Sequence, residues 1–343
     1  MKWNPIILFF GGIITLLLLS LRSGDVFIND FQVPKGWPEP FYSFHSNPLT
    51  KDGFELGRKL FYDPSLSVDS TVSCASCHLQ YTAFTHVDHA VSHGINGRKG
   101  TRNAPALVNL AWNKHFHWDG GVNHLDAQGL NPIEHPTEMG NSLKEVIRRL
   151  ESDPAYKNGF NRTFGEGPIT SSNLLKALSQ FTIQLVSANS KYDQVMRKEE
   201  GVAFSEQERR GLHIFRKHCS TCHQEPLFNA NFFASNGLTP DSLLNDLGRF
   251  QVTLLPKDKY LFKVPTLRNI AYSYPYMHDG RFQKLKDVIN YYSSGINSNA
   301  KNLHQSLKKP KKFSEIEKKD LLAFLLTLTD QAFLRNKDFS FPR

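Results

Sequence analysis

Two short stretches of the sequence, Cys74-Ala-Ser-Cys77-His78 and Cys219-Ser-Thr-Cys222-His223, share the pattern Cys-x-x-Cys-His and contain all four cysteines of the 343-residue chain. The pattern is typical of haem c attachment, because the two thiols form thioethers to the haem vinyl groups and the adjacent histidine binds the iron. A zinc site or redox-active cysteine pairs would use the same thiols, but neither accounts for a histidine after each pair. We therefore expect two covalent haems, with His78 and His223 as proximal iron ligands.

The length and composition favour two domains. A chain of 343 residues with 40% hydrophobic content can bury about two cores. We expect an N-terminal domain over residues 45–196 and a C-terminal domain over residues 204–335, each with one haem. The polar stretch 197–203 is the expected linker.

Residues 1–22 form an apolar N-terminal segment. Lys2 precedes an apolar run from Pro5 to Leu19, which fits the core of a signal peptide or a short membrane anchor. No Ala-x-Ala cleavage site follows the run, so a cleaved signal and an uncleaved anchor both stay open. Because haem c is attached outside the bacterial cytoplasm, either alternative predicts a periplasmic protein.

The formal net charge of +9 bears on which kind of partner the protein binds: nucleic acid, an acidic protein or an anionic membrane. Lysines and arginines are scattered along the chain, and the cluster at 308–312 is typical of a solvated loop, so we expect no nucleic-acid partner. An acidic electron-transfer protein or an anionic membrane surface suits the charge better.

Helix signals recur along the chain, whereas convincing alternating strands do not. Capping boxes begin at Ser142, Ser205 and Ser314, each before apolar residues at helical spacing. We also expect a helix over residues 51–61, before the first Cys-x-x-Cys-His motif, and a long buried helix over residues 174–186. The sequence therefore predicts a mainly α-helical fold.

A weak internal repeat extends beyond the two motifs. Arg102-Asn103 is followed by Trp118-Asp119-Gly120, and Arg268-Asn269 is followed by His278-Asp279-Gly280, with a leucine five residues after the glycine in both halves. The two halves therefore resemble a duplicated cytochrome domain.

Residues 50 to 330 resemble the bacterial dihaem cytochrome c peroxidase family, which includes the MauG-type enzymes. Besides the haem motifs, the resemblance rests on the ordered segments Leu60-Phe61-Tyr62-Asp63-Pro64, Arg102-Asn103-Ala104-Pro105, Trp118-Asp119-Gly120, Pro132-Ile133 with Glu138-Met139, Val264-Pro265-Thr266-Leu267-Arg268-Asn269 and Pro275-Tyr276-Met277-His278-Asp279-Gly280. It implies two tandem cytochrome c-like domains, with a peroxidatic haem in the first and an electron-transfer haem in the second. The implied reaction is reduction of hydrogen peroxide to water, with electrons from a small cytochrome c or copper protein.

By this resemblance, Glu138 and Gln128 line the peroxide side of the first haem, and Trp118 lies between the haems. A buried carboxylate can carry the proton that peroxide cleavage requires, so Glu138 is the acid/base candidate. The alternatives are an exposed helix-terminal glutamate and a core tryptophan. His93 resembles a distal ligand of the first haem but lies two residues further from Arg102 than the family pattern has it; a surface histidine is the alternative.

The second haem departs from the best-known peroxidases of the family, which place a methionine ligand fourteen residues after the histidine of His-Asp-Gly. Fourteen residues after His278 stands Tyr292, which resembles the MauG arrangement. A phenolate ligand favours ferric iron. The alternatives are that Tyr292 is an ordinary helix residue and that Met277 or His278 lies near the iron.

The resemblance also implies a calcium ion between the domains, bound by the side-chain oxygen of Asn103 and by carbonyls near Ser273 and Pro275. Asn103 could equally be a turn residue. Two further functions stay open: a MauG-like oxidase of a protein substrate, and a dihaem electron carrier without catalysis. A homodimer stays open as well.

The paired motifs generate the first prediction. The intact mass of the mature protein should exceed the mass of its polypeptide by two haems, because four thioether bonds survive denaturation. Mass spectrometry after acid denaturation measures this directly, and a mass with no added haem, or zinc in its place, would contradict the assignment.

Overall fold

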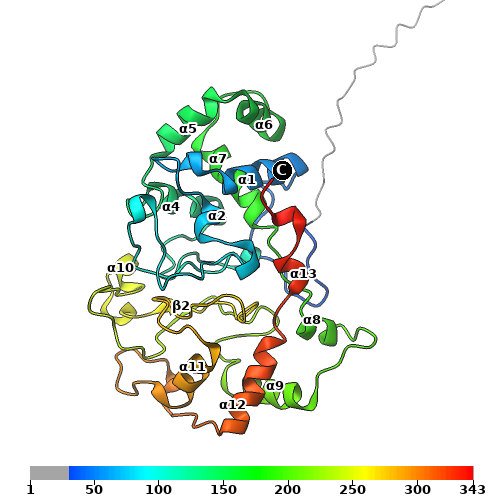
Figure 1. Ribbon diagram of the computed structural model, residues 1–343, viewed down its shortest axis with the longest axis vertical. Coiled ribbons are helices and arrows are strands. Elements are labelled where there is room, and N and C mark those ends of the chain that lie inside the picture. The colour runs from blue at the N-terminus through cyan, green and yellow to red at the C-terminus, as the bar shows by residue number, and fades with distance from the viewer. Residues whose placement is uncertain (1–30, 343) are drawn as a thin grey trace, which may run out of the picture.

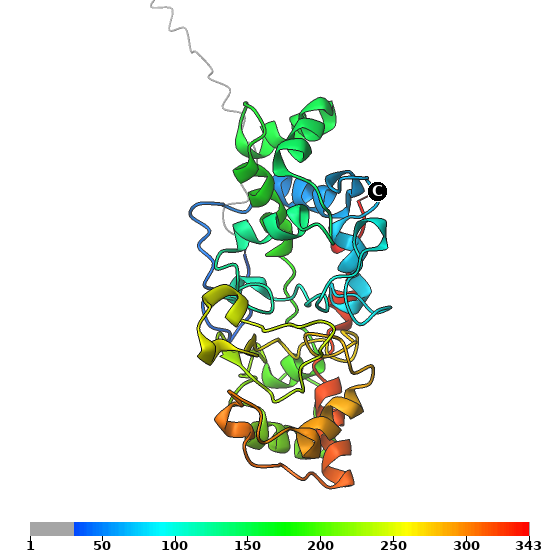
Figure 2. The ribbon, with the colours of Figure 1, turned by 90° about the vertical axis from the view of Figure 1, so that its left-hand side faces the viewer.

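The computed structural model describes residues 31–342, so the expected N-terminal segment 1–22 lies outside the described residues. Figures 1 and 2 show two lobes stacked along the long axis, with α10 and β2 at their junction. The helices are α1 Lys51–Tyr62, α2 Cys74–Cys77, α3 Leu125–Gln128, α4 Leu130–Glu134, α5 Leu143–Ser152, α6 Pro154–Phe164, α7 Ser171–Thr182, α8 Lys191–Met196, α9 Glu206–His218, α10 Phe250–Thr253, α11 Leu285–Asn290, α12 Glu315–Leu326 and α13 Gln331–Leu334; the strands are β1 Phe233–Ala234 and β2 Phe262–Lys263, which pair antiparallel. The prediction of a mainly α-helical fold is confirmed. Within residues 31–342, no helix combines the length and apolar character that a membrane crossing needs.

Each lobe has its own hydrophobic core. In the first, Leu60 and Phe61 of α1 are buried against Phe181 of α7. In the second, Phe215 of α9 is buried against Phe324 of α12. The helix expected over residues 51–61 corresponds to α1. The helix expected over residues 174–186 corresponds to α7, which begins earlier, at Ser171, and ends earlier, at Thr182, so residues 183–186 lie outside it.

Close helix packing depends on one glycine in each lobe. A Cβ placed on Gly57 of α1 would lie 2.0 Å from the carbonyl oxygen of Ala177 in α7. A Cβ on Gly211 of α9 would lie 2.0 Å from the carbonyl oxygen of Asp320 in α12. Any larger residue would push these helices apart. In both lobes the glycine-bearing helix is also the helix that precedes the Cys-x-x-Cys-His motif.

The capping boxes at Ser205 and Ser314 form with both reciprocal hydrogen bonds. At Ser142 only half of the box forms: Ser142 Oγ accepts from Glu145 N, whereas the Ser142 N–H donates to Asn141 Oδ1. The Glu145 carboxylate instead pairs with Arg148 and Arg149.

Three segments cross between the lobes. Tyr192 of α8 packs in the second core although it precedes the expected linker, and Phe333 of α13 returns to the first core. The segment 31–47, which we call the strap, lies against the first lobe, where Trp112 Nε1 donates to the Pro38 carbonyl (2.7 Å). Trp37 of the strap also stacks on the guanidinium of Arg268, 4.5 Å from the ring centre.

Two arginines form charge pairs at the lobe boundaries. Arg102 Nε donates to Asp246 Oδ2 (2.6 Å) and Arg102 Nη1 donates to Asp119 Oδ2 (2.5 Å). Arg268, which is fully buried, donates to both carboxylate oxygens of Asp193 (2.8 and 2.7 Å). Such pairs contribute mainly by avoiding unpaired buried charge.

Substitution of Arg102 generates the second prediction. Arg102→Met leaves Asp246 unpaired, so we expect the free energy of unfolding at pH 7 to fall by about 3 kcal/mol in urea titrations. Burial by itself raises the pKa of Asp246, but the hydrogen bonds and charge of Arg102 outweigh it and lower the pKa. The pairing therefore stabilises the fold above about pH 4, the unfolded value, and is lost as the pH falls through the lower folded value.

The difference between wild type and Arg102→Met should accordingly shrink on acidification. Arg148→Met is the matched control, because Arg148 is an exposed partner of Glu145 and exposed ion pairs contribute little to stability. Equal destabilisation by the two variants would contradict the role assigned to Arg102.

Candidate active site

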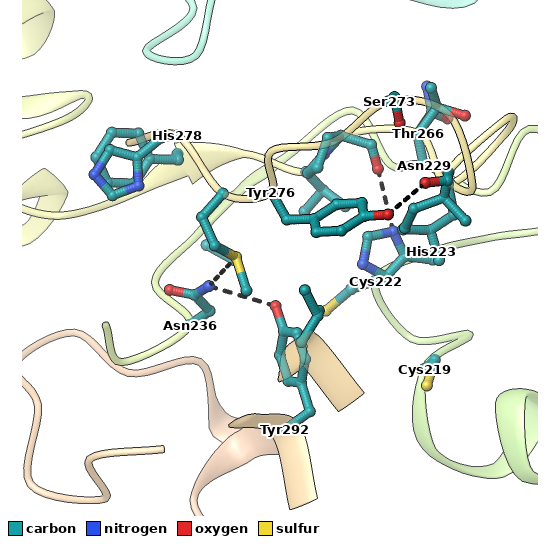
Figure 3. Close-up of a pocket in the computed structure, with 18 of the residues that line it drawn as sticks. Cys219, Cys222, His223, Asn229, Asn236, Thr266, Ser273, Tyr276, His278 and Tyr292 are labelled. Carbon is teal, nitrogen blue, oxygen red and sulfur yellow. Dashed lines mark hydrogen bonds between the residues drawn. The ribbon is translucent and has the colours of Figure 1, made fainter. Parts of the chain in front are cut away.

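The second Cys-x-x-Cys-His motif lines a large cavity. Cys219 caps the C-terminal end of α9, and the cavity that it lines with Cys222 and His223 has a volume of about 250 Å³. A single water needs only about 10–15 Å³, so the space suits a large group. The lining is mainly apolar, and Figure 3 shows the motif on one side of it. These residues fit a haem attached through both thiols.

Hydrogen bonding fixes the tautomer of His223. Its Nδ1 donates to the carbonyl oxygens of Phe228 and Pro265, both at 3.1 Å. Carbonyls only accept, so Nδ1 carries the proton and Nε2 keeps the lone pair that an iron ligand needs. Burial lowers the pKa of His223 to about 4, which keeps the ring neutral at physiological pH.

Tyr292 and Met277 meet at the same amide in this cavity. Asn236 Nδ2 donates to Tyr292 Oη and to Met277 Sδ, both at 3.4 Å (Figure 3). Burial raises the pKa of Tyr292 to about 12, although the bond from Asn236 acts in the opposite direction. The neighbouring Tyr291 is engaged elsewhere, since its hydroxyl donates to the Asn236 carbonyl (3.0 Å). Tyr292 and Met277 therefore both bring a ligand atom into the cavity.

The first motif has the same local design. It forms the short helix α2, and His78 Nδ1 donates to the Phe84 carbonyl (2.7 Å). Burial lowers the pKa of His78 to about 4. His78 and His223 thus present Nε2 in the same way, which the sequence motif alone does not specify.

Glu138 and His93 both lie beside the first motif. The His93 carbonyl oxygen is 3.5 Å from Cys77 Sγ, and the N–H of Ile95 donates to the Glu138 carbonyl (2.8 Å). Burial, and after it the charge of Glu138, raises the pKa of Cys77 to about 11. Burial also raises the pKa of Glu138 itself. The structure therefore brings the acid/base candidate to the first attachment site.

The turn at Gly94 makes this approach possible. A Cβ on Gly94 would lie 2.2 Å from the Thr137 carbonyl oxygen and 2.4 Å from Glu138 Cα. The side chain of His93 stacks edge-on against His89, with ring centres 4.1 Å apart, and its buried Nδ1 has no hydrogen-bond partner among the described residues.

Sequence reasoning missed His117. Its backbone has a φ of +62°, and its buried Nε2 has no hydrogen-bond partner within residues 31–342. The ring bonds the backbone of Gln128, and burial lowers its pKa. The charge of His117 also helps to lower the pKa of His78, which places Gln128 and His117 in the surroundings of the first motif.

Trp118 connects the first lobe with the cavity of the second motif. Its Nε1 donates to the Asn103 carbonyl (2.8 Å), and its own carbonyl accepts from the N–H of Lys263 (2.7 Å). The indole lines the cavity and faces His278 edge-on, with ring centres 6.5 Å apart. His278 stacks on Phe262.

Asn103 has one unpaired oxygen. Its Nδ2 donates to the Pro275 carbonyl (2.6 Å), and its buried Oδ1 has no partner among the described residues. Ser273 lines the same cavity. An orphaned amide oxygen beside a carbonyl suits a hard cation. No group of three His, Cys, Asp or Glu side chains in residues 31–342 is arranged to hold a metal ion.

Comparison with known proteins gives consistent matches. The family model of the di-haem cytochrome c peroxidases matches residues 51–201. The methylamine utilization protein MauG of Methylorubrum extorquens is 36% identical over 304 residues, covering 87% of this chain and 83% of the relative. A cytochrome c551 peroxidase of Nitrosomonas europaea is 30% identical over 334 residues, covering 96% and 94%.

Solved structures agree with the sequence matches. The crystal structure of a MauG-like protein associated with microbial copper homeostasis superposes with a TM-score of 0.83 at 33% identity, covering 92% of this chain and 99% of the other. Family membership implies two haem c groups, and the cavity at the second motif fits one of them. The chain belongs to the di-haem cytochrome c peroxidase family.

Proposed function

We propose that the protein reduces hydrogen peroxide to water with electrons from a small periplasmic redox protein. The observation that carries the proposal is the approach of Glu138 to the first attachment motif through the turn at Gly94. When bound, the two haems supply iron that exchanges single electrons and, at the first site, takes up peroxide. The protein supplies the proton transfer, the route between the sites and the exclusion of water.

Glu138 moves the proton. Peroxide cleavage needs a proton to pass from the inner oxygen to the outer one, and a carboxyl group within reach can accept and return it. Burial raises the pKa of Glu138, which makes the carboxyl group a better proton acceptor than an exposed glutamate. Gln128 and His117 border the same site and orient the bound peroxide and water.

Trp118 provides the route for electrons between the sites. Its indole lines the second cavity while its ring nitrogen is held by Asn103. Tyr292 would hold the second haem together with His223, and His93 would be a releasable ligand that helps His78 to hold the first. Calcium at Asn103, Ser273 and Pro275 would hold this junction together.

A MauG-like oxidase that acts on a protein substrate is the second candidate function. The hydroxyl of Tyr292 in the second cavity favours it, because a phenolate holds iron in the ferric form. The MauG relative is 36% identical to this chain, compared with 30% for the Nitrosomonas europaea peroxidase. A dihaem carrier without catalysis is disfavoured by the carboxyl group of Glu138 at the first site.

Turnover measurements separate the three functions. A peroxidase consumes peroxide rapidly with reduced cytochrome c as donor, and a carrier consumes none. A MauG-like oxidase reacts with peroxide as isolated, in the fully oxidised form, but turns over slowly with the donor.

We further propose a periplasmic location, with residues 1–22 as a cleaved signal or an anchor, and a donor with an acidic docking face that complements the net charge of +9. Homodimer formation stays open.

Glu138→Gln provides the third prediction. The amide cannot relay a proton, so peroxide turnover should fall about a hundredfold to ten-thousandfold while both haem spectra stay unchanged. Glu134→Gln, at an exposed position of α4, is the matched control and should turn over normally. Turnover of Glu138→Gln within about twofold of wild type would remove Glu138 from the mechanism.

Tyr292→Phe provides the fourth prediction. Loss of the phenolate oxygen should change the absorption and electron paramagnetic resonance spectra of the second haem and raise its reduction potential. Tyr291→Phe is the matched control, since its hydroxyl bonds the Asn236 carbonyl. A spectral change in Met277→Leu but not in Tyr292→Phe would show that the thioether is the ligand.

A further inference from the structure

Lys263 is a half-buried cation without a counter-ion among the described residues. It ends β2, lines the cavity of the second motif, and pairs with Phe233 of β1. Burial is the cause that lowers the pKa of Lys263 to about 8. The ionisable groups that its charge reaches are His115 and His117, which are bases as well.

The rest of the cavity offers Lys263 no anion. The lining contains two lysines, Lys263 and Lys311, and no aspartate or glutamate. Lys311 Nζ donates to the Ser306 carbonyl (2.7 Å), so its charge is partly satisfied. An ammonium group that lines an apolar cavity without an anionic partner is unfavourable, so the cavity suits an anion that arrives with the ligand.

Two contacts, one of Lys263 itself and one of the preceding Phe262, fix the position of Lys263 in the cavity wall. Its backbone N–H donates to the Trp118 carbonyl (2.7 Å), and the preceding Phe262 stacks on His278 with ring centres 3.8 Å apart. Lys263 therefore lines the cavity directly beside Trp118.

We propose that Lys263 is the counter-ion of a propionate carboxylate of the haem attached at Cys219 and Cys222, and that it raises the reduction potential of that haem. The propionates are the anionic substituents of haem, and the cavity provides no other carboxylate for the lysine. A positive charge near the iron disfavours the ferric form, which carries one more positive charge than the ferrous form. The proposal rests on the haem that the family implies at this motif, and not on the peroxide reaction.

The test measures the reduction potential of each haem at pH 7 by spectroelectrochemistry, without peroxide. In Lys263→Met, the ratio of ferrous to ferric C-terminal haem at a given applied potential should fall about tenfold, which is 59 mV for one electron. The N-terminal haem should keep its potential. Lys263→Arg keeps the charge and should retain most of the wild-type potential.

Lys286→Met is the control for the loss of one positive charge, since Lys286 is exposed on α11 and its charge is screened by solvent. If Lys263→Met does not mature, Lys263→Gln takes its place in the same titration. An unchanged potential, a shift confined to the N-terminal haem, or an arginine variant that shifts as far as the methionine variant would each overturn the proposal.

This result is separate from the outcome for peroxide turnover. A protein that proves inactive towards peroxide can still show the shift in Lys263→Met, which would support the counter-ion while rejecting the peroxidase. A protein that turns over peroxide but shows no shift of potential in Lys263→Met would support the peroxidase while rejecting the counter-ion.

Discussion

The guanidinium of Arg102 lies largely buried at the junction between the two lobes, and a largely buried positive charge needs a negative partner. Its partners Asp119 and Asp246 come from opposite sides of that junction. Pairing fixes the next residue, Asn103, whose N–H donates to the His278 carbonyl and whose own carbonyl holds Trp118. The orientation of the Trp118 indole at the second cavity therefore depends on the pairing of one guanidinium.

The second half of the chain repeats this arrangement with different partners. Arg268 pairs with Asp193 of α8, and Asn269 bonds Ser187 and the N–H of Asp330. In the first half the Arg-Asn pair reaches the opposite lobe, and in the second half it reaches the segments that connect the lobes. The same two residue types thus orient a tryptophan in one half and anchor the chain connections in the other.

The fold and the attachment chemistry were predictable because their signals are local. A Cys-x-x-Cys-His motif contains all the atoms that make the bonds, and the helices α1 and α9 are encoded by their own caps and apolar spacing. The candidate site was predictable only through the family resemblance, since Glu138 and Cys77 are far apart in the sequence.

The remaining features depend on contacts between distant segments. Asn236 contacts Met277 and Tyr292 only in the folded second lobe. Nothing in the sequence distinguishes Lys263 from other lysines, because its role depends on the absence of carboxylates from the cavity lining. No sequence pattern singles out His117, whose backbone φ of +62° and buried Nε2 without a partner among the described residues are visible only in the structure.

The strap has a consequence for the order in which the chain becomes structured. Phe41 and Tyr42 donate their N–H groups to the Ala111 carbonyl, and Trp37 rests on Arg268. Arg268 is synthesised long after Trp37, so the first part of the described chain to leave the ribosome has no complete binding surface until most of the protein exists. Contacts of such long sequence separation form slowly. We therefore expect the strap, residues 31–47, to be among the last described segments to take its final place, once both lobes have formed.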